Sequence, residues 1–285
     1  MVSVVLPVRD VATTVGEQLA ALAAQDFAGR WEVVVADNGS RDATVDVVRA
    51  WADRLPDLRV VRADGRRGVS HARNVAAAAA RADLLAVCDG DDVVEPAWLS
   101  AVVAASERGD VVAGRLDEQA LNSPIVRAWR RPRPTDGATV IRGFLPYATG
   151  ANCAVWKRVV EDVGGWNEDY VAAGNDVEFS WRAQLAGHRL AFAPDAVVRY
   201  RYRSDLRSWA RQAFAGGRAS AHLMADFRSH GLPSVPLPDV AWNWLRLLVR
   251  SPRLLRPGSR GWWVGEAAGT LGRVVGSFEH RVIAL

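Results

Sequence analysis

Short apolar segments alternate with amphipathic segments through the first part of the chain, and this alternation restricts the fold more than any other feature. The apolar segments are continuous and rich in valine, and they fall at residues 2–8, 31–37, 58–64 and 84–89. Segments of helical period follow them, at about residues 14–25, 42–54, 70–82 and 96–108. Strands that are apolar on both faces and separated by helices are typical of a parallel sheet covered on both sides. The sequence therefore predicts an α/β fold with a mostly parallel central sheet.

The pattern becomes less regular after a further strand, VVAGRL, at residues 111–116. Residues 117–149 are rich in Pro, Arg and small polar residues and predict a long irregular segment, which in a compact domain is usually functional or disordered. A small-residue strand in ANCAVW and helices at about 157–163 and 175–185 are expected next. Two short strands, RLAFAP and AVVRYRY, are expected to be joined by a Pro-Asp turn, and residues 204–230 are expected to be helical.

Composition limits the class of protein and its location. The chain has 285 residues, of which 49% are apolar and 24% charged, as in globular proteins that bury a core without disulfides. Its two cysteines, Cys88 and Cys153, have no disulfide or zinc spacing and favour buried thiols in a reducing cytoplasm. No secretory signal and no apolar stretch of about 20 residues is found. We therefore expect a cytoplasmic protein.

Four residues after the fourth strand form an acidic turn, Asp89-Gly90-Asp91-Asp92. Carboxylate oxygens suit Mg²⁺ or Mn²⁺, and Mg²⁺ sites usually combine one or two carboxylates with phosphates. Gly90 lets the chain bend so that both flanking carboxylates point to one place. The alternative is a solvated acidic turn at a strand end. The turn by itself therefore leaves a divalent-cation site and a simple surface turn both open.

Two further segments, ADNGS and GVSHARN, follow strands in the same half of the chain. Asp37 could bond a ribose hydroxyl or a base edge, although Asn38 and Ser40 also suit a turn and a helix cap. Arg73 lies in the first turn of a helix whose amino end could face a diphosphate, or it belongs to an ordinary helix start. Ligands of parallel sheets bind beyond the carboxyl ends of the strands, so Asp37 and Asp89 are expected in one crevice.

In order and spacing, VSVVLPVRD, EVVVADNGSRDAT and GVSHARNVAAAAARADLLAVCDGDD resemble the nucleotide-binding half of glycosyltransferase family 2, which has the GT-A fold. A later block, from GANCAVWKRVVEDVGGWNEDY to GHRLAFAPDAVVRY, resembles the acceptor half of that family. The resemblance implies a GT-A catalytic domain at residues 1–203, with a nucleotide-sugar-binding half at 1–116 and an acceptor half at 117–203. Residues 204–285 would be a C-terminal helical extension rich in Trp and Arg.

The resemblance implies an inverting glycosyltransferase that uses a nucleoside-diphosphate sugar as donor, and it assigns donor contacts. Asp37 would contact the base or its ribose, and Pro7 and Arg9 would lie beside the same nucleotide. Arg73 would approach the diphosphate. Asp89 would belong to the donor site as the first acid of the family's DxD pair.

The resemblance also implies a cation site and a general base. Asp89 and Asp91 would hold Mg²⁺ or Mn²⁺, with Asp91 as the direct ligand, and the cation would neutralise the leaving nucleoside diphosphate. Asp176 would take the proton from the acceptor hydroxyl as that hydroxyl attacks the anomeric carbon. The alternative for Asp176 is an acid near a helix N-terminus that the helix dipole stabilises.

Three positions depart from the family pattern. Asn175 is uncharged where relatives have the first member of an acid pair, and Asn38 stands at the second acidic position of the nucleotide motif. Many relatives place a metal-binding histidine after the strand that ends near Arg199, whereas Tyr200 stands here, and the nearest later histidine is His222. These departures put the strength of cation binding in question.

The C-terminal segment combines tryptophan and leucine with arginine, as in Trp242, Leu248, Arg246 and Arg250. Such an amphipathic segment, within residues 240–285, could lie on an anionic membrane at the inner face of the cell membrane. Alternatively it forms a helical pair packed on the catalytic domain or on a dimer partner. The acceptor implied by the resemblance is a glycan, a lipid-linked molecule or a small molecule.

Other functions remain as alternatives. A nucleotidyltransferase would need a basic phosphate-gripping loop after the first strand, where only Arg9 is found. A non-catalytic member of the same fold that binds a nucleotide or a partner would fit the uncharged Asn175. The net charge of +4 and the pI near 9.6 also suit nucleic acid, but no nucleic-acid-binding module is recognisable, so no nucleic-acid partner is expected.

Overall fold

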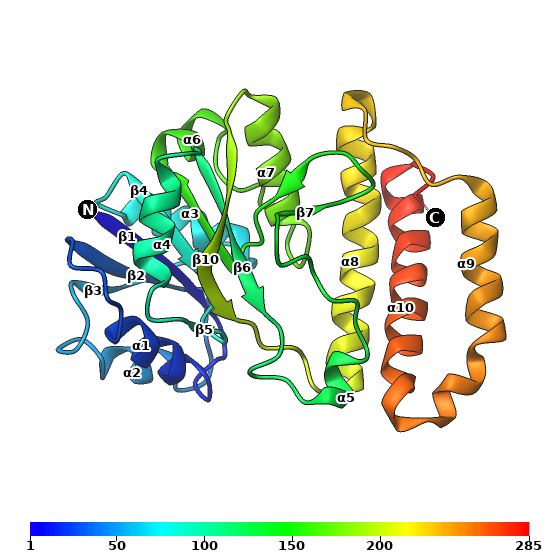
Figure 1. The fold of residues 1–285 in the computed structure, drawn as a ribbon, viewed down its shortest axis with the longest axis horizontal. Helices are drawn as coiled ribbons and strands as arrows, with labels where there is room; N and C mark the ends of the chain where they lie inside the picture. The colour runs from blue at the N-terminus through cyan, green and yellow to red at the C-terminus, as the bar shows by residue number, and fades with distance from the viewer. Residues whose placement is uncertain (285) are drawn as a thin grey trace.

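An eight-stranded sheet forms the centre of the protein in the computed structural model, which describes residues 1–284 (Figure 1). The strand order is β3-β2-β1-β4-β9-β6-β10-β5. The bounds are β1 (Val2–Val8), β2 (Trp31–Asp37), β3 (Leu58–Arg62), β4 (Leu84–Cys88), β5 (Val93–Val94), β6 (Val111–Asp117), β9 (Asn152–Trp156) and β10 (Leu190–Arg199). All neighbouring pairs are parallel except those of β9 with β4 and β6 and that of β5 with β10. The predicted α/β fold with a mostly parallel sheet is confirmed.

Helices cover both faces of this sheet. One face packs against α1 (Val15–Ala23), α2 (Thr44–Arg49) and α4 (Trp98–Ser106). The other packs against α3 (Val69–Ala79), α6 (Lys157–Asp162) and α7 (Asn175–Leu185). Within β1, Val4 and Leu6 face the first layer and Val5 faces the second. Burial on both sides explains why these strands are continuously apolar in sequence.

The segment between β6 and β9 is largely irregular, as expected. It contains α5 (Pro124–Arg127) and a two-stranded ribbon of β7 (Thr139–Val140) and β8 (Pro146–Tyr147). Ser123 caps α5, since its Oγ accepts a hydrogen bond from the amide of Val126 at 3.4 Å. The segment crosses in front of α8 (Figure 1). Trp129 in this segment is buried beside Tyr202.

The expectation of two strands joined by a Pro-Asp turn is wrong, because residues 190–199 form the single strand β10. Both halves of β10 pair with β6, and the register shifts between Ala193 and Val197. Pro194 and Asp195 therefore lie in a bulge of one strand. Proline has no amide hydrogen for the ladder and is tolerated at such a bulge.

Three helices complete the chain, namely α8 (Leu206–Phe227), α9 (Leu237–Val249) and α10 (Pro257–His280), with the short 3-10 turns η1 (Arg228–His230) and η2 (Ser251–Leu255). Helix α10 lies close along α8, and Figure 1 shows α9 on the outer side of α10. The close approach depends on glycines such as Gly272, because a Cβ there would collide with the carbonyl of Phe214 on α8. None of the helices within residues 1–284 combines the length and apolar character needed to cross a bilayer.

Candidate active site

The carboxyl ends of β1, β2 and β4 lie together at one edge of the sheet. In the β1–β2 ladder Pro7 is opposite Ala36 and Val8 is opposite Asp37. The acidic turn after β4 reaches the end of β1, since a Cβ added at Gly90 would contact the Val8 side chain. Asp37 and the acidic turn therefore share the edge at which parallel sheets bind ligands.

The expected nucleotide contacts occupy this edge without a direct link to the acidic turn. Pro7 is buried within β1. The Asp37 carboxylate accepts a hydrogen bond from the amide of Ser40 at 3.0 Å, and Arg9 Nε lies 3.6 Å from Asp10 Oδ2. Among the residues that the structure describes, no hydrogen bond or ion pair joins Pro7, Arg9 or Asp37 to the acidic turn.

The hydrogen bonds of Asn38 explain why an amide stands at this position of the nucleotide motif instead of an acid. Its side-chain amide nitrogen donates to the carbonyls of Ala63 and Arg66, and its Oδ1 accepts from the amide of Gly68 at 2.9 Å. Asn38 thus ties the end of β2 to the loop that leads into α3. A carboxylate can accept but cannot donate to two carbonyls, so this position needs the amide.

Arg73 joins the acidic turn to the beginning of α7. Its side chain is 3% exposed, and Nη2 donates to Asp89 Oδ1 at 3.1 Å while Nη1 donates to Asn175 Oδ1 at 2.7 Å. Gly150 lies directly against the guanidinium, where a Cβ would collide with it. The uncharged Asn175 therefore serves as the second acceptor for a buried arginine.

Asp176 is the second residue of α7, and its carboxylate lies next to this arrangement. Oδ2 accepts a hydrogen bond from the amide of Gly150 at 3.1 Å, and Oδ1 accepts one from the amide of Val177 at 2.9 Å. Because Gly150 also contacts Arg73, the structure brings Arg73, Asp89 and Asp176 into one group. Burial raises the pKa of Asp89, the Arg73 charge opposes this rise, and the charges of Asp91 and Asp176 add to it.

Two arginines that the sequence analysis did not single out hold the rest of the acidic turn. Arg203 Nη1 lies 2.7 Å from Asp91 Oδ2. The amide of Arg201 donates to Asp92 Oδ1 at 2.7 Å, and Arg201 Nε donates to the Asp91 carbonyl at 2.8 Å. Asp92 is buried, and burial with the charges of Asp91 and Asp89 raises its pKa well above the usual range. The alternating sequence RYRYR at 199–203 is the feature of the sequence that could have pointed to these two arginines.

Tyr200 replaces the expected histidine beside this turn. Burial raises its pKa to about 12, and the charges of Asp92, Asp89 and Asp91 contribute to the rise while Arg133 opposes it. The phenol of Tyr200 is therefore protonated at neutral pH. His222 lies on α8 instead, stacked between Tyr170 and His280.

The acidic turn fits a divalent cation only if phosphates and water complete the coordination. Asp89 and Asp91 keep side-chain exposures of 30% and 17%, so both carboxylates are accessible. Within residues 1–284 no three His, Cys, Asp or Glu side chains are arranged to hold a metal ion together. Two carboxylates with phosphate and water ligands are an ordinary arrangement for Mg²⁺.

The fold is similar to that of solved GT-A enzymes. The mannosyltransferase PcManGT from Pyrobaculum calidifontis, in complex with GDP-Man and Mn²⁺, has a TM-score of 0.65 and 22% identity, covering 98% of this chain and 87% of its own. S. aureus TarS 1–349 in complex with UDP has a TM-score of 0.55 and 17% identity, covering 98% of this chain and 91% of its own. The protein has the GT-A fold with additional C-terminal helices.

Comparison of sequences gives the family. The model of Glycosyl transferase family 2 matches residues 3–164, which is more than half of the chain, and the chain belongs to this family. Glycosyltransferase AglE of Haloferax volcanii is 30% identical over 199 residues, or 69% of this chain and 65% of AglE. The pre-mycofactocin glycosyltransferase of Mycobacterium tuberculosis is 30% identical over 230 residues, or 77% of this chain. The chain spans only 47% of that second relative.

Proposed function

We propose that this protein transfers a sugar from a nucleoside-diphosphate donor to an acceptor hydroxyl and inverts the anomeric configuration. The observation that carries the proposal is the contact of Arg73 with both Asp89 and Asn175, because it joins the acidic turn to the helix that carries Asp176. A cation-binding pair of acids and a potential base thereby belong to one crevice. Membership of glycosyltransferase family 2 supports the same reaction.

The donor would lie across the carboxyl ends of β1, β2 and β4. Asp37, with Pro7 and Arg9 beside it, would bind the nucleoside, and the diphosphate would lie near Asp89, Asp91 and the basic side chains around them. Mg²⁺ or Mn²⁺ held by Asp89 and Asp91 would supply charge neutralisation to the diphosphate. PcManGT is solved with GDP-Man and Mn²⁺ and TarS with UDP, which supports a donor of this class.

Asp176 would act as the general base. Its two oxygens accept hydrogen bonds from the amides of Gly150 and Val177, which fix the carboxylate without neutralising it. As the acceptor oxygen forms its bond to the anomeric carbon, Asp176 would take the hydroxyl proton and the bond to the nucleoside diphosphate would break. Attack from the face opposite the leaving group inverts the configuration.

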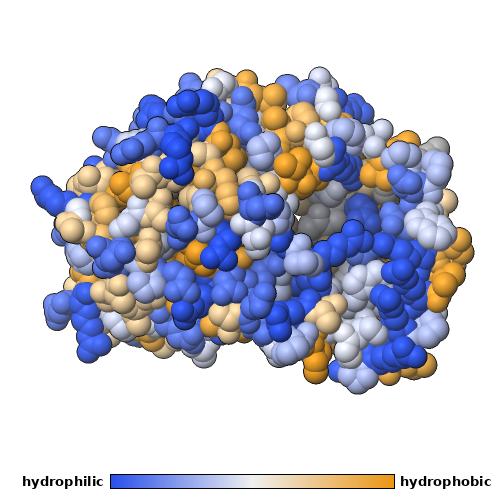
Figure 2. All heavy atoms as spheres, viewed as in Figure 1, coloured by the Kyte–Doolittle hydropathy of each residue, from blue (hydrophilic) through white to orange (hydrophobic). Residues whose placement is uncertain are grey.

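We also propose that residues 1–203 form the catalytic unit and that 204–285 complete its acceptor side and contact an anionic membrane from the cytoplasm. Several apolar side chains of α9 and η2 are exposed, with Leu248 at 72% and Leu255 at 86%. Figure 2 shows apolar atoms gathered along the edge where α9 lies. Arg250 and Arg256 adjoin this surface, and an apolar face bordered by arginine suits the interface of anionic lipids.

A thermal-shift experiment with a panel of nucleoside diphosphates, each with and without Mn²⁺, tests the donor site. We expect one base to raise the melting temperature more than the others, since a ligand that binds only the folded state stabilises it. If no nucleoside diphosphate raises the melting temperature, with or without Mn²⁺, the proposed donor site is wrong.

A further inference from the structure

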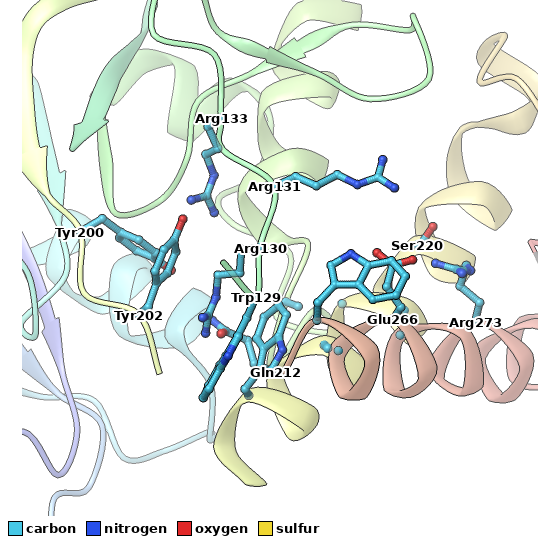
Figure 3. A pocket seen from close by; sticks show the side chains of 18 residues that line it. Trp129, Arg130, Arg131, Arg133, Tyr200, Tyr202, Gln212, Ser220, Glu266 and Arg273 are labelled. Carbon is cyan, nitrogen blue, oxygen red and sulfur yellow. The ribbon is translucent and has the colours of Figure 1, made fainter. Parts of the chain in front are cut away.

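A cavity of about 480 Å³ lies between the irregular 117–149 segment and helices α8 and α10, outside the residues assigned to the donor (Figure 3). Its lining includes Ala173 and Tyr200, which come from two different segments of the chain. Ala173 is followed by Gly174, which caps α7 just before Asp176, and Tyr200 adjoins the acidic turn. The cavity therefore adjoins both the segment that leads into the proposed base and a side chain beside the acidic turn.

Positive charge dominates the walls of this cavity. Its lining contains the single carboxylate of Glu266 and four arginines, Arg130, Arg131, Arg133 and Arg273. Two of these charges are compensated, since Arg133 pairs with Glu118 and Glu266 pairs with Arg246 at 2.5 Å. Among residues 1–284, no carboxylate lies within ion-pair distance of Arg130, Arg131 or Arg273.

Arg131 and Arg273 lie at the end of the cavity away from Tyr200, whereas Arg130 stacks on Tyr202 near Tyr200. Figure 3 shows the side chain of Arg131 extending toward the end where Ser220, Glu266 and Arg273 lie. Arg142 approaches the same place from outside the lining, with Nη2 at 3.4 Å from Ser220 Oγ. Three guanidinium groups and a hydroxyl thus surround one region.

Burial of Arg142 and Arg273 explains why this place favours an anionic ligand, while Arg131 is exposed. Burial lowers the pKa of Arg142, and the charge of Arg273 adds to this effect. Burial also lowers the pKa of Arg273, the charge of Arg246 contributes, and Glu266 opposes it. Partly buried cations without a counter-charge are costly, and a phosphate or carboxylate between them removes that cost through charge-assisted hydrogen bonds. Arginine is the side chain best suited to this geometry.

The rest of the wall is aromatic. Trp129, Trp209 and Trp262 line the cavity, and Arg130 stacks between the rings of Tyr202 and Trp209 at 4.1 and 4.0 Å from their centroids. Trp129 is 6% exposed, yet its Nε1 donates to no acceptor in the described part of the chain. A buried indole N–H normally has a partner, and this one lacks a partner among residues 1–284 although the Trp129 side chain lines the cavity. Aromatic walls with a few polar groups are typical of small-ligand sites.

We propose that this cavity is the acceptor site and that the acceptor is a phosphorylated saccharide. Its sugar would lie against the tryptophans, and its phosphate would be held by Arg131, Arg142 and Arg273. The assignment of this cavity as the acceptor site rests on the proposed function, because it requires Asp176 to be the base. The binding of a phosphorylated saccharide in the cavity does not depend on that role of Asp176. The phosphate can belong to a soluble sugar phosphate or to a lipid-linked one.

Isothermal titration calorimetry tests the ligand class. The probes are the 1-phosphates of glucose, mannose, galactose and N-acetylglucosamine, with the methyl glycosides of the same sugars and inorganic phosphate as comparisons. Titrations are performed on the full chain in the presence of a saturating nucleoside diphosphate, so that the donor site cannot take up the phosphate. The variants are Arg273→Gln and, as a matched control, Arg108→Gln, which changes an exposed arginine after α4.

We expect at least one sugar phosphate to bind more tightly than its methyl glycoside and than inorganic phosphate. Arg273→Gln should weaken this binding about tenfold or more, because a hydrogen bond to a charged group is lost, and Arg108→Gln should leave it unchanged. Tighter binding of a decyl phosphodiester of the same sugar would identify a lipid-linked acceptor, and equal binding a soluble one.

Three outcomes would overturn the proposal: no binding of any sugar phosphate at millimolar concentration, equal binding of the methyl glycosides, or an unchanged dissociation constant in Arg273→Gln. The melting temperature of each variant and its shift with nucleoside diphosphate are measured alongside. In the unmodified protein, absence of sugar-phosphate binding together with an intact nucleoside diphosphate shift would reject this inference alone. Loss of the nucleoside diphosphate shift in the unmodified protein would reject the donor site.

Discussion

Arg203 holds Asp91 in an ion pair, with Nη1 of the arginine 2.7 Å from Oδ2 of the aspartate. Asp91 is the carboxylate that the family resemblance assigns to the cation, so an arginine and a cation would compete for the same oxygen. The Arg203 side chain is 52% exposed, and ion pairs of that exposure contribute little to stability. The pair can therefore open when a donor diphosphate and a cation bind.

Replacing Arg203 by Ala should increase the affinity for Mn²⁺. The change removes a positive charge from Asp91 and frees Oδ2, and we expect the dissociation constant to fall about two- to fivefold, in line with an exposed ion pair. Electron paramagnetic resonance of free Mn²⁺ measures it directly. Arg207→Ala, an exposed arginine on α8, is the matched control. Equal Mn²⁺ affinity in Arg203→Ala and the unmodified protein would contradict competition for Asp91.

Asp176→Asn should abolish most transfer while leaving donor binding intact. The amide oxygen can still accept from the Gly150 amide, but it cannot take a proton, so we expect kcat to fall by about 10³-fold. The measurement is nucleoside diphosphate released from sugar donors that carry the base identified by the thermal-shift panel. Asp195→Asn, an exposed acid in the β10 bulge, is the control. Full activity in Asp176→Asn would remove Asp176 as the base.

Arg73→Lys should destabilise the protein. A single ammonium cannot reach both Asp89 and Asn175, which leaves a buried acceptor without its partner. We expect the free energy of unfolding to fall by about 3 kcal/mol, as for other broken buried pairs. Urea denaturation measures this change against Arg108→Lys, in which an exposed arginine is replaced. A loss no larger than that of the control would mean that Arg73 does not hold the two segments together.

The double variant Leu248→Glu with Leu255→Glu should reduce sedimentation with vesicles of phosphatidylglycerol and phosphatidylcholine. Two exposed apolar side chains leave the proposed contact surface, and we expect the partition coefficient to fall about tenfold or more. The matched control is Ile125→Glu with Val140→Glu, since both residues are half exposed outside α9 and η2. Point variants are preferable to truncation, because Val282 near the chain end belongs to a core shared with α7 and α8. Equal sedimentation of the two double variants would exclude this surface as the membrane contact.

Glu32 should make the stability depend on acid pH. Burial alone would raise its pKa, but hydrogen bonds from Arg81, Ser3 and Arg59 and the charge of Arg59 outweigh it and lower the pKa below 4.5. A carboxylate with a lowered pKa in the folded state contributes stability above its unfolded pKa and loses it as pH falls through the folded value. Between about pH 6 and about pH 3 the unmodified protein should lose more free energy of unfolding than Glu32→Gln, which does not titrate. If urea denaturation shows the same loss of unfolding free energy in both proteins, Glu32 does not contribute to the pH dependence.

Local patterns predicted the elements of the nucleotide half well. Continuous valine-rich segments predicted β1, β2 and β4, because a strand buried on both faces is apolar at most positions. The edge strand β3 is only half-buried and carries Arg59 and Arg62. The Asp89-Gly90-Asp91-Asp92 turn was placed at a strand end for the same reason. The pattern failed at residues 190–199, since Pro194 and Asp195 indicate a turn locally, and only pairing of both flanks with β6 makes one bulged strand.

The sequence by itself determined the α/β class, the family and the positions of Asp37, Asp89, Asp91 and Asp176 at strand or helix ends, because these follow from the order of consecutive residues. Only the tertiary structure decided what surrounds these carboxylates. Arg73 meets Asn175 from 102 positions away and Arg203 meets Asp91 from 112. Such contacts depend on how distant elements pack, and no local period encodes them. The arginine-lined cavity between the 117–149 segment and α10 exists for the same reason.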